Sequence, residues 1–172
     1  LTGVGNSSSL TLNTVVNSAG DFTSLPDITI PVAGVGVEDL TNEVVSTNVY
    51  GVYSEVTMLS FVLRSYQAPT TVNQINIIND GSVGFYTEEK LTSYGLNVWK
   101  VEIYQDEGTE TFNKSSDILV GKTECYYSSD SGSTCASDTA YVTVNIALDT
   151  YDSESSDTNE QMFFVVYYLG SS

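Results

Sequence analysis

The sequence predicts an all-β protein, an antiparallel β-sandwich of the jelly-roll or immunoglobulin-like type with an extended N-terminal donor strand. Short segments rich in Val, Ile, Tyr, Phe and Thr recur along the 172 residues, and turn residues separate them. Several segments alternate apolar and polar side chains, as strands do when one face packs against a core. A hydrophobic share of 41% is enough for one such core in a chain of this length.

The first twenty residues have the composition of an extended tail. No Met leads the chain, so we expect Leu1 to be a processed end. Alternate positions after Gly5 share one face of an extended strand, and these are Leu10, Leu12, Thr14 and Val16. We expect this strand to pair with a sheet, either the chain's own or that of a neighbouring subunit. The chain then divides into a tail over residues 1–20 and a β-sandwich head over residues 21–172.

Ten strands are predicted in chain order, separated by turn signals such as Asn79-Asp80-Gly81. One short helix is predicted at 87–94, where Thr87 suits the N-cap and Gly95 the C-terminal end. The predicted strands are Leu10–Val16, Asp27–Val32, Val44–Tyr53, Glu55–Tyr66, Thr71–Ile78, Ser82–Tyr86, Asn97–Gln105, Ile118–Tyr127, Thr139–Leu148 and Gln161–Leu169.

Two of these strands show the expected alternation. One face of 141–148 carries Val142, Val144, Ile146 and Leu148. In the segment 98–104, Trp99, Val101 and Ile103 oppose a face with Lys100 and Glu102, which we expect to be in contact with water. The closing strand, 162–169, is apolar on both faces. It is either a central strand or an edge strand that another chain covers.

The charge balance excludes whole classes of partner. The chain has 22 acidic and 5 basic residues, and its net charge of −17 repels nucleic acids and anionic membranes. No apolar run is long enough for a membrane span. Only 16% of residues are charged, so Ser, Thr, Asn and Tyr must cover most of the surface, as in extracellular structural proteins.

Cysteine usage and acceptor triplets also favour secretion. Cys125 and Cys135 flank a polar loop and are the only cysteines, so we expect a disulfide and an oxidising compartment. Two free thiols are the alternative. Asn6 and Asn113 each begin an Asn-X-Ser triplet, which makes N-linked glycans candidate partners.

The sequence offers no support for an enzyme, a metal site or a cofactor. Without His, neither a Ser-His-Asp nor a Cys-His arrangement is available, and no phosphate-binding glycine motif is present. Gly34-Val35-Gly36 reads as part of a Val-rich loop. The acidic segment 149–160 lacks the spacing of a calcium loop. We therefore expect neither catalytic residues nor metal ligands.

Two weaker possibilities concern covalent and sugar chemistry. Lys100 is a nominal partner for an isopeptide bond with Asn97 or Asn145, beside Glu102, although an exposed strand lysine is far commoner. Aromatic side chains that stack on sugars are a further possibility, most of all at Tyr126-Tyr127 and at Tyr50 with Tyr53, although most tyrosines in strands serve packing.

The tail, the charge-poor sandwich and the apolar closing strand 163–169 together resemble subunits of donor-strand fibres. These include archaeal thread-type and bundling pili, biofilm fibres of the camelysin type and, in architecture only, chaperone–usher pilins. The resemblance lies in organisation, and no diagnostic motif is matched residue by residue. It implies that the tail of one subunit completes the sheet of the next, which gives a linear head-to-tail homopolymer on the cell surface.

The leading hypothesis is thus a structural subunit of an extracellular filament that serves adhesion or biofilm formation. The first alternative is a monomeric secreted carbohydrate-binding module whose tail pairs within its own chain. The second alternative is a jelly roll of a viral capsid or a surface layer. The given sequence shows no long apolar N-terminal helix of the type IV pilin kind, so we expect this chain to fall outside that class.

Overall fold

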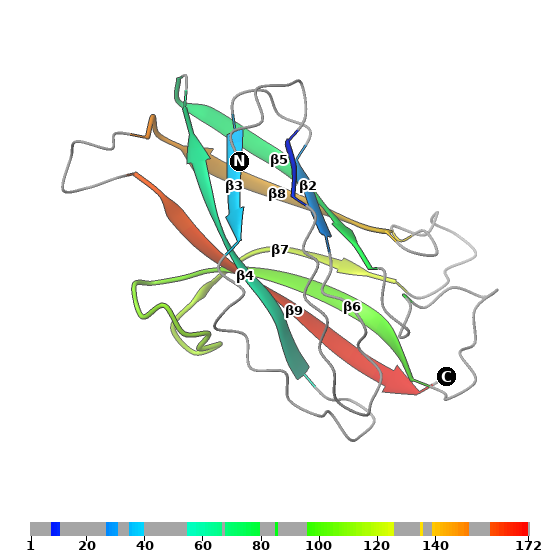
Figure 1. Ribbon diagram of the computed structural model, residues 1–172. Coiled ribbons are helices and arrows are strands. Elements are labelled where there is room, and N and C mark those ends of the chain that lie inside the picture. The colour runs from blue at the N-terminus through cyan, green and yellow to red at the C-terminus, as the bar shows by residue number, and fades with distance from the viewer. Residues whose placement is uncertain are drawn as a thin grey trace.

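The described part of the chain consists of antiparallel β-sheets in two layers (Figure 1). The computed structural model describes residues 8–10, 27–30, 35–39, 55–66, 68–79, 85, 96–125, 135, 139–151 and 159–171. All of its ladders are antiparallel, and no helix occurs in these ranges. The predicted all-β class is confirmed, and the arrangement is consistent with a β-sandwich.

One sheet has four strands in the order β1-β2-β5-β8. Its strands are β1 (Ser8–Leu10), β2 (Asp27–Ile30), β5 (Thr70–Ile78) and β8 (Thr139–Leu148). Burial in β8 follows the predicted alternation, because Val142, Val144, Ile146 and Leu148 are all buried. The intervening positions of β8 point away from the core and carry no charge.

The other sheet has five strands in the order β3-β4-β9-β6-β7. Its strands are β3 (Val35–Asp39), β4 (Glu55–Ser65), β6 (Leu96–Gln105), β7 (Ile118–Glu124) and β9 (Gln161–Ser171). The prediction that Val35 and Gly36 lie in a Val-rich loop is therefore wrong. These residues belong to β3, which pairs with the end of β4. β-Branched Val35 and Val37 suit a strand, and Gly36 allows a close approach described below.

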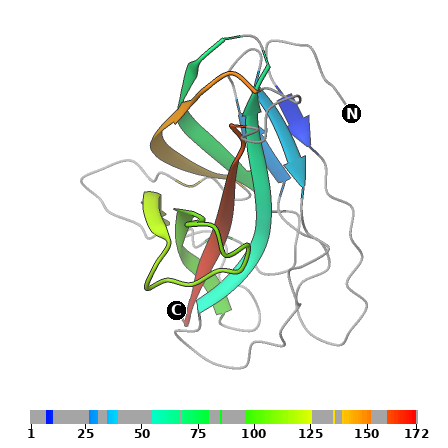
Figure 2. The same cartoon turned by 90° about the vertical axis from the view of Figure 1, so that its left-hand side faces the viewer.

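The two sheets pack face to face, as the two ribbon views together show (Figure 2). One apolar core lies between them. Both layers contribute, with Val72, Ile75 and Ile77 from β5 opposite Phe61, Val101 and Phe163. The rings of Phe61 and Phe163 stack with their centroids 5.4 Å apart. At one side of the molecule β7 comes close to β8, since a Cβ atom on Gly121 would lie 2.7 Å from the Thr143 carbonyl oxygen.

The closing strand β9 occupies the centre of its sheet. It pairs with β4 on one side and with β6 on the other. Both of its edges are thus satisfied within the chain, and both of its faces are buried, which explains its continuous apolar run. The alternative in which another chain covers this strand is wrong.

A β-bulge corrects the prediction for β6. The register shifts between Val98 and Lys100, so the Trp99 side chain packs on the outer face with Tyr104, Val166 and Tyr168 instead of beside Val101. The prediction that the outer face of β6 is in contact with water is also wrong, because Glu102 and Tyr104 are only 6% and 4% exposed. The predicted strand Val44–Tyr53 and the predicted helix 87–94 lie outside the described residues, as does most of 82–86.

Candidate functional site

The tail segment that was predicted to act as a donor strand enters the four-stranded sheet at its rim. Ser8, Ser9 and Leu10 form β1 and pair antiparallel with β2 of the same chain. Ser9 lies opposite Thr29, which in turn lies opposite Asn76 on β5. Leu12, Thr14 and Val16 lie outside the described residues. The structure thus gives the pairing partner of the tail, β2, and its register.

A second feature is a cluster of polar and aromatic side chains on the outer face of the five-stranded sheet. Its centre is Glu102 on β6. The carboxylate oxygen Oε2 accepts hydrogen bonds from the Tyr104 hydroxyl at 2.7 Å and from the Tyr168 hydroxyl at 2.5 Å. The other oxygen, Oε1, lies 2.9 Å from Lys100 Nζ. Each oxygen of this nearly buried carboxylate therefore has a partner, as burial of a charge demands.

The lysines of this cluster also sit against aromatic rings. Lys100 Nζ lies 3.6 Å from the ring centroid of Tyr168 and 5.1 Å from that of Trp99. Trp99 in turn lies over Gly170, where an added Cβ atom would come within 2.8 Å of the indole Cδ1. These contacts place the lysine ammonium against the faces of two aromatic rings, where a cation–π attraction holds it.

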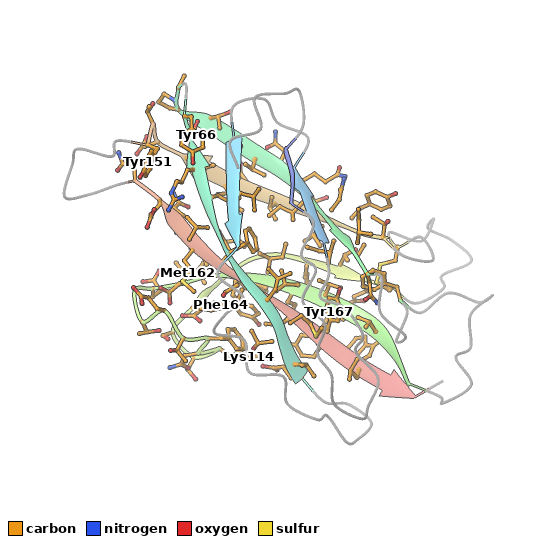
Figure 3. The ribbon with its side chains drawn as sticks, in the orientation of Figure 1. Tyr66, Lys114, Tyr151, Met162, Phe164 and Tyr167 are labelled. Atoms are coloured by element: carbon orange, nitrogen blue, oxygen red, sulfur yellow. A yellow bond between two sulfur atoms is a disulfide. The ribbon has the colours of Figure 1, made fainter. Side chains whose placement is uncertain are left out.

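The segment between β6 and β7 covers this cluster. Phe112 packs edge-to-face on Tyr104, with centroids 5.1 Å apart, and against Phe164 at 5.7 Å. Lys114 donates hydrogen bonds to Tyr168 Oη at 2.6 Å and to Glu55 Oε2 at 2.5 Å. We call residues 106–117 the latch. It ties β4, β6 and β9 together on one face, and Figure 3 shows Lys114 and Phe164 on this side of the sheet.

The start of the latch is organised by one carboxylate. Asp106 accepts backbone hydrogen bonds from Gly108 at 2.9 Å and from Thr109 and Glu110, each at 3.2 Å. Gly108 adopts a φ of 96°, which glycine tolerates without strain. Local hydrogen bonds to Asp106 thus fix the shape of the first part of the latch, which precedes the residues that contact the sheet.

The electrostatics of the cluster indicate a structural role. Burial alone would raise the pKa of Glu102, but hydrogen bonds from Tyr168, Tyr104 and Lys100 outweigh it, and the pKa falls below its usual value. Burial and the Glu102 carboxylate raise the pKa values of the Tyr104 and Tyr168 hydroxyls. The hydrogen bond to Glu55 raises the pKa of Lys114. All four groups thus keep their ordinary charge near neutral pH, with a carboxylate and an ammonium paired among neutral hydroxyls.

The geometry disfavours one isopeptide bond considered from the sequence. Lys100 and Asn145 lie on the outer faces of opposite sheets, because Val144 and Ile146 on either side of Asn145 are buried in the core between them. Lys100 is instead paired with Glu102. The side chain of Asn97 lies outside the described residues.

The structure places the remaining candidate residues as follows. Cys125 and Cys135 form the expected disulfide, with their Cα atoms 5.2 Å apart. Asn113 is exposed on the latch, where its Oδ1 accepts a hydrogen bond from the Ser115 amide at 3.0 Å. Asp149 is exposed, and the described residues contain no cluster of acidic side chains that would hold a metal. Outside the described residues lie Asn6, Tyr50, Tyr53, Tyr126, Tyr127, Asp152, Glu154 and Asp157.

A third feature was missed by the sequence reasoning, an aromatic corner where β4 ends and β9 begins. We call Arg64, Tyr66, Tyr151 and Glu160 the tyrosine corner. The rings of Tyr66 and Tyr151 meet edge-to-face with centroids 5.5 Å apart. Figure 3 shows the two side chains close together at this end of the molecule. Arg64 lies 5.1 Å from the Tyr151 centroid and pairs with Glu160. Nothing in the local sequence around Tyr66 signals a partner so far along the chain.

Comparisons with protein-family models, with curated proteins and with solved structures gave no match to this chain. Within the described residues, no helix has the length and apolar character needed to cross a membrane.

Proposed function

We propose that this protein is the structural subunit of an extracellular filament, joined head to tail by exchange of the strand around β1. The observation that carries the proposal is the position of β1. It lies at the rim of the four-stranded sheet, and among the described residues it pairs with β2 through Ser8, Ser9 and Leu10. A rim strand is the kind of element that neighbouring copies exchange at low cost.

The connection from β1 to β2 also permits exchange. Residues 11–26 join the two strands, whereas a tight hairpin uses about two to five residues. No short turn therefore forces β1 onto its own β2. The same three residues from another copy make the same backbone hydrogen bonds on the same edge. When the copy that receives a strand passes its own strand to a third copy, the contact is heterologous, does not close into a swapped dimer and propagates as a fibre.

The remaining features agree with a durable extracellular part. The Cys125–Cys135 disulfide suits an oxidising compartment, and the exposed Asn113 suits glycosylation. The latch cluster and the doubly buried β9 reinforce the head domain, which must stay folded when a filament is under load. Adhesion or biofilm formation is the role that such a filament serves.

Cysteines at a register pair test whether β1 stays in its own chain. Ser9 and Thr29 lie directly opposite each other, at a Cα separation that suits a disulfide in antiparallel pairs, about 4.5–5.5 Å. We mix subunits that carry only Ser9→Cys with subunits that carry only Thr29→Cys, oxidise them, and run a non-reducing gel. Exchange between copies gives covalent dimers, and strand pairing within each chain gives monomers only.

The double variant extends the test to the filament. Ser9→Cys with Thr29→Cys is expected to give a covalent ladder under exchange, whereas a ladder-free monomer band contradicts the proposal. Thr71→Cys with Ala147→Cys is the matched control, since this register pair joins β5 and β8 inside the head. The control pair should lock within one chain in every case.

A further inference from the structure

We propose that the tyrosine corner is a binding site for a neutral carbohydrate. This inference goes beyond filament assembly and concerns a surface on the head domain. It rests on four side chains that come from the end of β4 and the residue after it, from the segment after β8 and from the residue that precedes β9. They are Arg64, Tyr66, Tyr151 and Glu160.

The backbone holds the corner in place. Ser65 and Thr150 form a parallel bridge, and the Tyr151 amide donates a hydrogen bond of 2.6 Å to the Ser65 carbonyl. Asn159 Nδ2 donates to the Thr150 carbonyl at 3.1 Å. The Ser65 hydroxyl donates to the Ala68 carbonyl at 2.5 Å. Two chain segments far apart in sequence are thereby fixed beside each other, so the rings they carry are preorganised.

A glycine supports the exposed ring. An added Cβ atom on Gly36 would lie 2.3 Å from Tyr66 Cε2, so the Tyr66 ring lies directly over the β3 backbone. Gly36 pairs with Arg64, which makes Tyr66 its diagonal neighbour across the strands. Tyr66 nevertheless remains 47% exposed. A large aromatic side chain that is braced on one side and open to water on the other is suited to stacking on a flat ligand.

Polar groups flank the rings in a way that fits hydroxyl groups. Arg64 Nη2 and Nε lie 2.6 and 2.8 Å from the same oxygen of Glu160, Oε2. The second oxygen, Oε1, is therefore an additional acceptor at the surface. A planar guanidinium beside a carboxylate supplies donors and acceptors within a few ångströms, as recognition of sugar hydroxyls requires.

The charges select a neutral ligand over an anionic one. Glu160 balances the charge of Arg64 inside the corner, and the whole chain carries a net charge of −17. An acidic polysaccharide or a phosphate group would meet repulsion without an unpaired cation to offset it. A neutral hexose polymer carries no charge and therefore meets no such repulsion.

The test measures binding of neutral hexasaccharides of glucose, mannose and N-acetylglucosamine to the full chain, by saturation-transfer NMR and calorimetry. We expect at least one to bind, and Tyr66→Ala to weaken that binding by about tenfold or more. Tyr66→Phe keeps the ring and should retain binding. Gly36→Ala pushes the ring off the strand and should weaken binding while the head stays folded.

Tyr141→Ala is the matched control. Tyr141 is 44% exposed on β8 of the other sheet, so its loss should leave binding unchanged. Equal loss in Tyr141→Ala and Tyr66→Ala overturns the proposal. So does the absence of binding to every hexasaccharide, which would leave a protein partner as the occupant of this surface. Tighter binding of a hexagalacturonate than of the neutral sugars also overturns it.

Discussion

Tyr168 on β9 donates a hydrogen bond to the carboxylate of Glu102 on β6, with 2.5 Å between the two oxygens. The two residues are diagonal neighbours, since Tyr168 pairs with Lys100 in the register of the two strands. The latch adds Lys114 to the same hydroxyl from above the sheet. One tyrosine thus joins β9, β6 and the latch, and the outer face depends on its acceptor, Glu102.

Replacing Glu102 tests this dependence. Glu102→Gln removes the negative charge that balances Lys100 and keeps only one acceptor oxygen, so either the lysine or the two tyrosine hydroxyls face an amide NH2 group. We therefore expect the unfolding free energy to fall by about 2–4 kcal/mol. Denaturant unfolding followed by tryptophan fluorescence measures this change, and Trp99 reports on the cluster itself. Glu160→Gln breaks an ion pair nearer the surface and should cost less than about 1 kcal/mol. Equal losses in the two variants would contradict the central role of Glu102.

The stability difference between wild type and Glu102→Gln should depend on pH in a defined direction. The pKa of Glu102 in the folded protein lies below the ordinary value of 4.5. Its contribution is therefore fully present above that value and is lost as pH falls through the lower folded pKa. The stability difference between wild type and Glu102→Gln should be constant near neutral pH and shrink in acid. A difference that grows as pH falls would show that Glu102 is not stabilised as a carboxylate.

Reduction of the Cys125–Cys135 disulfide should lower stability without loss of the fold. The bridge joins residues that are 10 apart in sequence, and a closed loop of this size contributes about 2–3 kcal/mol through the unfolded state. Thermal unfolding with and without dithiothreitol measures the effect once mass spectrometry confirms both thiols. The variant with Cys125→Ala and Cys135→Ala should not respond to the reductant. An unchanged midpoint for the reduced wild type would contradict the prediction.

Gly121 is a position where β7 and β8 approach closely. A Cβ atom there would lie 2.7 Å from the Thr143 carbonyl oxygen and 2.6 Å from Val144 Cγ1. Because one of these atoms belongs to the backbone, Gly121→Ala must move a strand and should cost about 1–3 kcal/mol. Lys122→Ala, exposed on the same strand, should stay within about 0.5 kcal/mol of wild type. Calorimetry measures the unfolding free energy of both variants. Equal values for the two would contradict a tight contact between β7 and β8 at Gly121.

The strands were predicted best where the local pattern was complete. Five long strands, β4, β5, β6, β8 and β9, begin and end close to the predicted residues. Alternation located the buried face of β8, because each residue's face in a regular strand follows from its position alone. In β6 the same argument was wrong at Trp99, where one bulged residue shifts the face of the side chain.

The sequence by itself determined the all-β class, the strand segments and the one disulfide, since these depend on local periodicity and on there being only two cysteines. Only the tertiary structure decided that β9 is central, that β1 pairs with β2, and that Tyr66 meets Tyr151. An apolar strand looks the same whether its own sheet or another chain covers it. Which strands and side chains meet depends on packing between segments far apart in sequence, and no local pattern records that packing.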